Sequence, residues 1–303
     1  MSEVTGGRPL RSLLFIPADS EKKLAKVATC GADAVILDLE DAVAEANKPA
    51  ARAMAAQFLA QHPPGARACE VWIRVNPFDT GLTLADLAAI VPGAPDGIVQ
   101  PKTDGPEDVA RLSHYLDALE AAHGLPAGAI RIIPVATETP LGALALGDFA
   151  KAALPRLAGL TWGAEDLSTA LSASTNRARD GQWADAYRMV RSLCLIAGHA
   201  AGVPVYDTLH TDFRDEAGLT ESSRAARAEG FAGRLAIHPA QVGPINAAFA
   251  PSAEELTHAR AVLAAFAANP GAGTVGLNGK MLDVPHRKQA ERIVAEARAF
   301  GIF

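Results

Sequence analysis

The residues most suited to chemistry form a cluster of carboxylates at the end of an apolar run. Residues 34–39, Ala-Val-Ile-Leu-Asp-Leu, are followed directly by Glu40 and Asp41. Asp38 and Glu40 are two positions apart, so on a β-strand their side chains share one face. Like charges repel and burial penalises each of them, so acids at the tip of a buried strand need a cation nearby. The stretch predicts a divalent-metal or polar-substrate site, or else the start of a solvated loop.

Polar residues also follow the other apolar runs of the chain, where the strands of a parallel sheet would end. They are Arg74, Asn76, Gln100, Lys102, Glu138, Glu165, Asp166, Asp207 and His238. Several acids that converge with one arginine and one lysine suit a hard cation such as Mg²⁺, which takes oxygen ligands and keeps positions open for substrate. Cysteine and histidine contribute too little for a zinc site.

The two cations of this set each have two interpretations. A Schiff-base aldolase would need a buried lysine of lowered pKa, for which Lys102 is the candidate, but we expect this lysine to pair with an acid. Arg74 is suited to bind a substrate carboxylate bidentately, or to form an ion pair with Glu40 or Asp41.

Glu138 and Asp166 are the strongest candidates for metal ligands. They follow the apolar runs 132–136 and 160–163, so both would emerge from strand ends one structural unit apart. Either residue could instead cap the helix that follows it. The presence of both favours a shared metal ion.

Short apolar runs alternate with longer amphipathic stretches along the chain. The predicted strands are residues 12–17, 34–39, 71–75, 97–101, 131–136, 159–163, 203–206 and 234–237. The predicted helices between them are residues 48–61, 106–123, 141–153, 183–201 and 216–229. Near-continuous apolar strands, each followed by a helix, predict an α/β protein with a parallel (β/α)8 TIM barrel, whose functional face is formed by the carboxyl ends of the strands. An open doubly wound sheet is the alternative, but the first strand-to-helix turn, residues 17–23, lacks a glycine-rich dinucleotide loop.

The pattern changes after the eighth strand. A helix over residues 252–268, a hairpin over 274–284 with an Asn-Gly turn, and a helix over 285–300 are predicted. We therefore expect a catalytic barrel domain over residues 8–250 and a helix-hairpin-helix extension over 251–303. The extension is either a packed cap or an arm that contributes to a neighbouring subunit's site.

Composition bounds the partners of this 303-residue chain. Its net charge is −6, its pI is about 5.8, and no basic tract is present, which argues against nucleic acid or an anionic membrane as the main partner. The three cysteines lack pairing or metal-ligand spacing, the start has no charged-then-apolar leader, and no apolar stretch approaches the roughly 20 residues of a membrane-spanning helix. We expect a cytoplasmic protein with reduced thiols and a small-molecule ligand.

Several ordered motifs resemble one family. They are Arg11-Ser-Leu-Leu-Phe-Ile-Pro17, Val35-Ile-Leu-Asp-Leu-Glu-Asp-Ala-Val43, Arg74-Val-Asn76, Pro101-Lys102, Glu138-Thr139, Gly163-Ala-Glu-Asp166, Asp212-Phe-Arg-Asp215, Ile237-His-Pro-Ala-Gln241 and Met281-Leu-Asp-Val-Pro285. This set resembles the citrate lyase β-subunit-like family of the HpcH/HpaI aldolase group, which includes malyl-CoA and citramalyl-CoA lyases. The likeness runs from Arg11 to the last helix.

The resemblance implies a TIM barrel that uses Mg²⁺ to cleave or form 3-hydroxyacyl-CoA thioesters such as malyl-, citramalyl- or citryl-CoA. The products would be acetyl-CoA and a 2-oxo acid, and the assembly a homotrimer or hexamer. By motif, Glu138 and Asp166 resemble the Mg²⁺ ligands, Arg74 the contact to the substrate carboxylate, and Asp283 an acid/base lent by a neighbouring subunit. The positions that match coenzyme A contacts are Phe15, Lys22, Lys26, Ile237 and His238. Asp38, Glu40 and Asp41 would orient metal-bound water and Arg74.

Some of these residues have structural alternatives. Lys22 and Lys26 are four apart, so on one helix face they could meet phosphates or simply be solvated. His238 could be a satisfied core histidine, and Asp283 could cap the helix that begins at Pro285.

The function also has rivals. The same site could deliver water to the thioester, as a malyl-CoA thioesterase, or work as a citrate lyase β-type subunit within a complex whose acyl group rides on a carrier protein. A CoA-independent pyruvate aldolase is a third alternative. Pro140 and the Thr208-Leu-His210 stretch depart from the family pattern in loops that shape the pocket, which leaves the identity of the 2-oxo acid open.

Overall fold

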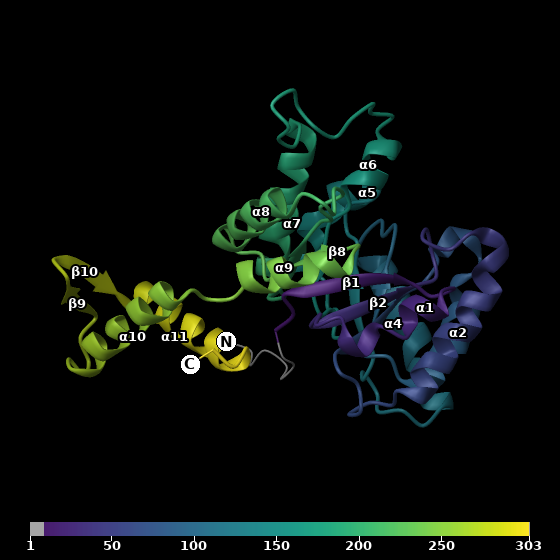
Figure 1. The fold of residues 1–303 in the computed structure, drawn as a ribbon, viewed down its shortest axis with the longest axis horizontal. Coiled ribbons are helices and arrows are strands. Elements are labelled where there is room, and N and C mark those ends of the chain that lie inside the picture. Colours follow the sequence, from purple (N-terminus) through teal and green to yellow (C-terminus); the bar gives the residue numbers. More distant parts are fainter. Residues whose placement is uncertain (1–8, 303) are drawn as a thin grey trace. The chain divides into compact units, whose positions relative to one another are not determined.

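A computed structural model describes residues 9–302 of the chain (Figure 1). Its contacts divide the chain into two compact units, Leu10–Ile245 and a second unit that begins at Asn246. The predicted barrel began at residue 8, which lies outside the described residues. No helix among the described residues is both long and apolar enough to cross a membrane.

The first unit is a barrel of eight parallel strands with helices between them, which confirms the predicted (β/α)8 TIM-barrel fold. The strands are β1 (Ser12–Pro17), β2 (Ala34–Asp38), β3 (Glu70–Arg74), β4 (Gly97–Gln100), β5 (Arg131–Pro134), β6 (Leu160–Thr161), β7 (Val205–Asp207) and β8 (Gly233–Ala236). Their order is β5-β4-β3-β2-β1-β8-β7-β6. Each predicted strand therefore has its counterpart within a few residues.

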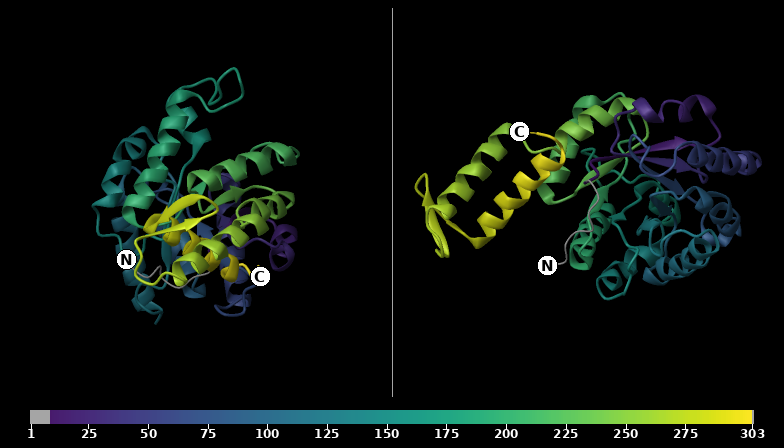
Figure 2. Two further views of the ribbon diagram at one scale, coloured as in Figure 1. Left: turned by 90° about the vertical axis from the view of Figure 1, so that its left-hand side faces the viewer. Right: turned by 90° about the horizontal axis from the view of Figure 1, so that it is seen from below.

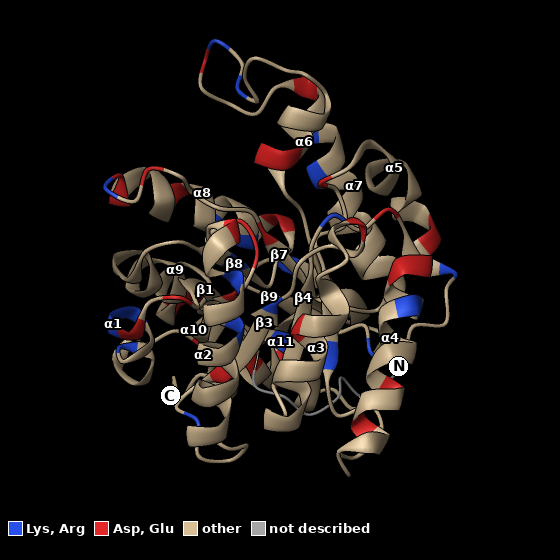
Figure 3. Cartoon of the chain, turned by 90° about the vertical axis from the view of Figure 1, so that its right-hand side faces the viewer, with Lys and Arg blue, Asp and Glu red and all other residues tan. Residues whose placement is uncertain are grey.

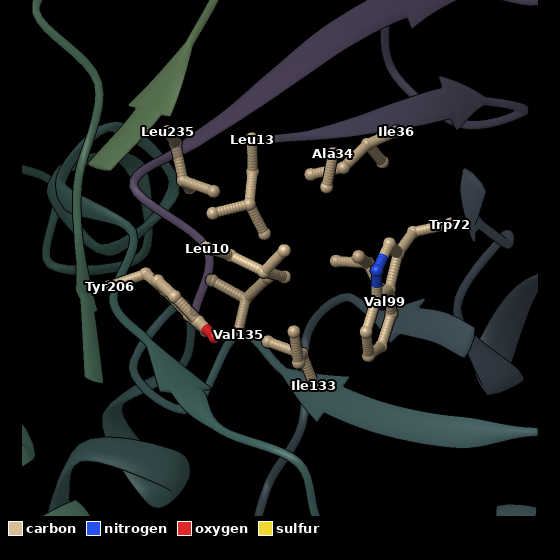
Figure 4. Packing of buried hydrophobic residues seen from close by; sticks show 10 residues of the cluster. All are labelled: Leu10, Leu13, Ala34, Ile36, Trp72, Val99, Ile133, Val135, Tyr206 and Leu235. Carbon is tan, nitrogen blue, oxygen red and sulfur yellow. The ribbon is translucent and has the colours of Figure 1, made fainter. Parts of the chain in front are cut away.

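Alternate residues of these strands fill the barrel interior (Figure 4). Leu13, Ile36 and Trp72 contribute from three neighbouring strands, and all three are fully buried. The Trp72 ring occupies the space beside Gly97, where a Cβ atom would lie 2.1 Å from the ring. Glycine at this position lets the indole pack inside the barrel, where a larger residue would force it out.

The barrel closes more loosely between β5 and β6 than elsewhere. The joining bonds run from Ile132 N to Arg156 O at 2.8 Å, from Ala158 N to Ile132 O at 2.9 Å, and from Ala136 N to Thr161 O at 2.9 Å. Backbone N–H groups of alternate residues on β5 face β6, and the one due at Pro134 does not exist. The ladder is interrupted there for that chemical reason.

The helices around the barrel agree best with the sequence where they are long. They are α1 (Glu21–Leu24), α2 (Lys48–Gln61), α3 (Thr83–Ile90), α4 (Pro106–Ala122), α5 (Pro140–Ala145), α6 (Ala164–Ala170), α7 (Asp185–Ala201), α8 (Glu216–Glu229) and α9 (Val242–Ala248). The prediction for α2 and α8 was correct to the residue. The predicted helix over 141–153 was wrong in extent: α5 gives way to a 3₁₀ segment, η5 (Leu146–Ala150), which contains a glycine of low helix propensity.

The second unit is a helical hairpin with a β-hairpin between its helices. It contains α10 (Ala253–Ala267), β9 (Thr274–Leu277), β10 (Lys280–Asp283) and α11 (Val284–Ala299), and α10 and α11 lie side by side (Figure 2). Asn278 and Gly279 join the strands with φ values of 51° and 74°, as the Asn-Gly turn predicted. Phe266, Val275 and Leu282 are buried in this unit's own apolar cluster.

Candidate active site

Arg74 lies among carboxylates at the carboxyl end of the barrel. It is the last residue of β3 and pairs in register with Asp38 of β2. Its Nε and Nη2 atoms donate to Asp38 at 2.7 and 2.6 Å, and its Nη1 lies 2.8 Å from Glu40. The expectation that buried acids at this strand tip need a cation is met by Arg74, which forms the ion pair that was one of its two interpretations.

The charge state of this cluster is set by burial and by the ion pairs. Burial is the largest single influence and lowers the pKa of Arg74, but the hydrogen bonds with Asp38 and the charges of the nearby carboxylates together raise that pKa, so the guanidinium stays charged. Burial raises the pKa of Glu40, and the charges of Arg74 and Lys102 partly oppose this. Phe15 places its ring 4.7 Å from the Arg74 guanidinium carbon, within cation–π range.

Lys102 links the first cluster to the second. Its ammonium forms an ion pair with Glu40 and lies 3.2 Å from Asp41 and 3.5 Å from Asp166. Burial is the largest single influence and lowers its pKa, but the hydrogen bond to Glu40 and the charges of Glu40, Asp166 and Glu138 together raise it. A Schiff-base lysine needs the opposite shift, so the ion-pair interpretation of Lys102 is confirmed.

Glu138 is a buried carboxylate that follows β5. Its Oε2 accepts the backbone N–H of Lys102 at 2.6 Å, a contact for which Lys102 adopts a left-handed φ of 48°. A Cβ atom on Gly163 would lie 2.7 Å from Glu138 Cγ, so glycine is needed for the side chain to fit. Burial, then the nearby charge of Asp166, raise the pKa of Glu138 to about 8.

Asp166 stands in the first turn of α6. The helix-cap alternative does not hold for Glu138, because Thr139 is the N-cap of α5 and accepts from Gly142 N at 2.9 Å. Gly163 occupies the N-cap position of α6, so Asp166 is not a cap either. Both carboxylates lie close to Lys102, Asp166 near its ammonium group and Glu138 at its backbone N–H. The negative charge of Asp166 raises the pKa of Glu138.

These two carboxylates fit a hard divalent cation. Burial is the main cause of the raised pKa of Glu138 and the charge of Asp166 is the second, so a cation held between the two carboxylates would stabilise their ionised forms. Mg²⁺ commonly uses one or two carboxylates and keeps several waters, so two protein ligands suffice. Among residues 9–302 no group of three or more His, Cys, Asp or Glu side chains could hold a metal.

Glu138 should make the metal-free protein less stable as pH rises. The unfolded chain loses this proton near the ordinary value of 4.5, whereas the folded protein keeps it up to about pH 8. Between these values the folded state binds more protons, so the free energy of unfolding falls with rising pH, by up to a few kcal/mol, and levels off above about pH 8. Urea unfolding in EDTA measures this slope. Glu138→Gln should flatten it, and an equal slope in wild type and variant would contradict the assignment.

The residues predicted to contact coenzyme A lie only partly where the sequence led us to expect them. Helix α1 ends at Leu24, before Lys26, so the prediction that Lys22 and Lys26 share one helix face was wrong; both are exposed. His238 is exposed and stacks on Phe213 at 4.7 Å between ring centroids, so it is not a core histidine. Ile237 is 39% exposed, unusual for isoleucine.

Asp207 does not join the site, contrary to the expectation for the tip of β7. Its carboxylate accepts from Trp162 Nε1 at 2.7 Å and Arg234 Nη2 at 2.7 Å, and Arg191 of α7 lies 3.2 Å away. Burial alone would raise the pKa of Asp207, but the arginines hold it below its ordinary value. Gly163, which leaves room for the Glu138 side chain, was not singled out from the sequence, although the Gly163-Ala-Glu-Asp166 motif contained it.

Asp283 lies in the second unit. It is the last residue of β10 and the N-cap of α11, which confirms the capping interpretation. Its Oδ1 is 2.5 Å from His286 Nδ1. The hydrogen bond to His286 lowers the pKa of this exposed carboxylate.

Fold and site together define a class of protein: a TIM barrel whose strand ends carry an acidic site, centred on an arginine, suited to metal-assisted chemistry on small acids. In the cartoon of Figure 3, segments with Lys or Arg are interspersed with segments with Asp or Glu. Residues 11–239 match the family described as HpcH/HpaI aldolase/citrate lyase, so the chain belongs to this family of carbon–carbon lyases.

Named relatives cover nearly the whole chain. Citrate lyase subunit beta of Escherichia coli K12 is 35% identical over 97% of this chain and 95% of its own. Mitochondrial citramalyl-CoA lyase of Rattus norvegicus is 32% identical over 95% of this chain and 86% of its own. The crystal structure of protein CitE from Mycobacterium tuberculosis, with magnesium, acetoacetate and coenzyme A, is 35% identical, with a TM-score of 0.76 over 96% of this chain and 98% of that one.

Proposed function

We propose that the protein is a Mg²⁺-dependent lyase that cleaves or forms a 3-hydroxyacyl-CoA thioester, yielding acetyl-CoA and a 2-oxo acid. The observation that carries the proposal is the buried Glu138 carboxylate beside Asp166, in a cluster joined through Lys102 and Glu40 to Arg74. Support comes from the CitE structure, which contains magnesium with coenzyme A and an oxo acid. Malyl-, citramalyl- and citryl-CoA are the candidate substrates.

In this proposal Glu138 and Asp166 hold the metal, which when bound polarises the substrate's hydroxyl and carbonyl oxygens. Arg74 contacts the substrate carboxylate with the part of its guanidinium that the ion pairs leave open. Asp38 and Glu40 fix the position of Arg74, because they take hydrogen bonds or ion pairs from three of its nitrogen atoms. The arginine is therefore ordered before the substrate arrives, and less entropy is lost on binding.

Asp283 supplies the proton transfer in this proposal, from a neighbouring subunit of a homotrimer or hexamer. In cleavage the substrate hydroxyl loses its proton to solvent and becomes the carbonyl of the 2-oxo acid, and the electron pair of the broken carbon–carbon bond stays on the acetyl fragment. That fragment leaves as a thioester enolate, and the Asp283 carboxyl protonates it. In condensation the Asp283 carboxylate removes a proton from the acetyl methyl group. The exposed position of Asp283 is compatible with a role at another subunit's site.

Coenzyme A is proposed to lie along Phe15, Lys22, Lys26, Ile237 and His238. The exposed lysines offer charge to phosphates, and the exposed Ile237 offers an apolar surface. We further propose a cytoplasmic enzyme, with no nucleic-acid or membrane partner.

The test is an assay of the purified protein with malyl-, citramalyl- and citryl-CoA, with and without Mg²⁺. We expect acetyl-CoA and a 2-oxo acid in equal amounts, only with Mg²⁺, from at least one thioester. Free CoA without a 2-oxo acid would show a thioesterase instead. Activity that appears only with an acyl carrier protein and partner chains would show a citrate lyase β-type subunit, an outcome that the E. coli relative makes worth testing.

A further inference from the structure

His286 lies against the carboxylate of Asp283 at the start of α11. It is the third residue of that helix, and its Nδ1 is 2.5 Å from Asp283 Oδ1 and 3.2 Å from the Asp283 backbone nitrogen. The Asp283 side chain is 44% exposed and that of His286 49%. The Asp283 carboxylate is therefore partly open to solvent while it contacts the imidazole.

Nδ1 of His286 has two partners in Asp283. When it carries the ring hydrogen it donates to the carboxylate at 2.5 Å, and when it does not it accepts the backbone N–H of Asp283 at 3.2 Å. The first tautomer places a hydrogen-bond donor against the Asp283 carboxylate.

Few other charged residues are close to the Asp283–His286 pair. In the described part of this unit, β9 and the second half of α10 (residues 261–267) carry no ionisable side chain. The other charged residues close in sequence are Lys280 on β10 and Arg287 and Lys288 on α11, and Arg287 lies 3.6 Å from Glu291. The main cause that lowers the pKa of Asp283 is accordingly its hydrogen bond to His286.

We propose that His286 is the positioning residue for Asp283, holding its carboxylate ionised and in one orientation as the base that removes the acetyl proton. This inference rests on the proposed function, which gives Asp283 its acid/base role. In condensation the methyl C–H bond breaks, its electron pair stays on the enolate and the proton passes to Asp283. A carboxylate that is hydrogen-bonded to imidazole remains ionised below its ordinary pKa of 3.8 and keeps its orientation as a base.

The test variant is His286→Gln. Glutamine at the third helical position is an ordinary capping-box partner, so α11 keeps its cap while the imidazole is lost. His258→Gln, at an exposed histidine of α10, is the matched control. Carboxyl ¹³C NMR of the full-length protein follows the titration of Asp283 without any need for activity. We expect Asp283 to titrate at higher pH in His286→Gln than in wild type or control.

A second measurement follows the condensation of acetyl-CoA with glyoxylate or pyruvate against pH. The acidic limb of the rate profile should move to higher pH in His286→Gln, with a several-fold loss in buffer near or below the ordinary carboxyl pKa of 3.8 and little change at neutral pH. Unchanged titration of Asp283, or a shifted titration with an unchanged rate profile, would overturn the positioning role. A wild-type protein without condensation or cleavage would count against the proposed function, and the titration would still decide whether His286 sets the state of Asp283.

Discussion

Glu138→Gln is expected to lower Mg²⁺-dependent thioester cleavage by about a thousandfold or more. The metal is proposed to contribute several kcal/mol of charge stabilisation, and each ~1.4 kcal/mol corresponds to a factor of ten in rate. The variant should still fold, because the amide oxygen can accept the Lys102 N–H and a buried carboxyl whose pKa is raised by burial is removed. Release of acetyl-CoA at saturating Mg²⁺ measures the loss.

Glu165→Gln is the matched control for this experiment. Glu165 precedes Asp166 on α6 but is exposed and accepts a hydrogen bond from Asn176 at 3.0 Å. The control should retain near wild-type turnover and the same dependence on Mg²⁺. A Glu138→Gln protein that turns over at the wild-type rate and binds Mg²⁺ equally well by calorimetry would show that Glu138 is not a ligand.

Arg74→Met is expected to reduce kcat/KM by at least about a hundredfold and to destabilise the barrel by about 3–5 kcal/mol. Its side chain is 12% exposed and those of Asp38 and Glu40 are 0% and 2% exposed, so removal of the arginine leaves Asp38 buried and uncompensated. Glu40 keeps its ion pair with Lys102. Urea unfolding measures the stability, and steady-state kinetics with a CoA thioester measure the activity.

The double variant Arg74→Met/Asp38→Asn separates stability from catalysis. Neutralising Asp38 removes the stranded charge, so most of the lost stability should return, while activity should stay low because the substrate carboxylate still lacks its partner. Recovery of activity together with stability would mean that Arg74 serves only the fold. A double variant as unstable as Arg74→Met would show that Asp38 is not the residue left uncompensated.

The sequence predicted the barrel because its strands are separate apolar runs, long enough to be recognised one by one. Helices α2 and α8 were equally clear, whereas α3 and α9 were missed, because helices of eight residues or fewer show too few turns for a helical period to be read. For the same reason α1 and α6 were expected only as a helix around Lys22 and a helix after Asp166, without bounds. The break between α5 and η5 depends on local geometry that periodicity does not encode.

The candidate site was predictable as a set of acids with two cations, but not in its details. Successive side chains of a strand point to opposite faces, so a shift of one residue decides whether a side chain points into the barrel or away from it. Asp207 points away from the interior and forms ion pairs with Arg191 and Arg234. The left-handed backbone of Lys102, which presents its N–H to Glu138, has no sequence signal, because lysine does not favour that conformation.

The interrupted ladder beside Pro134 has a consequence for the enzyme as a whole. Glu138 follows β5 and Asp166 follows β6, so the two proposed ligands stand on opposite sides of the weakest join in the cylinder. An ion bound by both carboxylates would link β5 and β6 where the hydrogen-bond ladder is interrupted. Metal binding and closure of the barrel would then be thermodynamically linked. Without Mg²⁺ the barrel would be least stable at the strand ends that carry the active site.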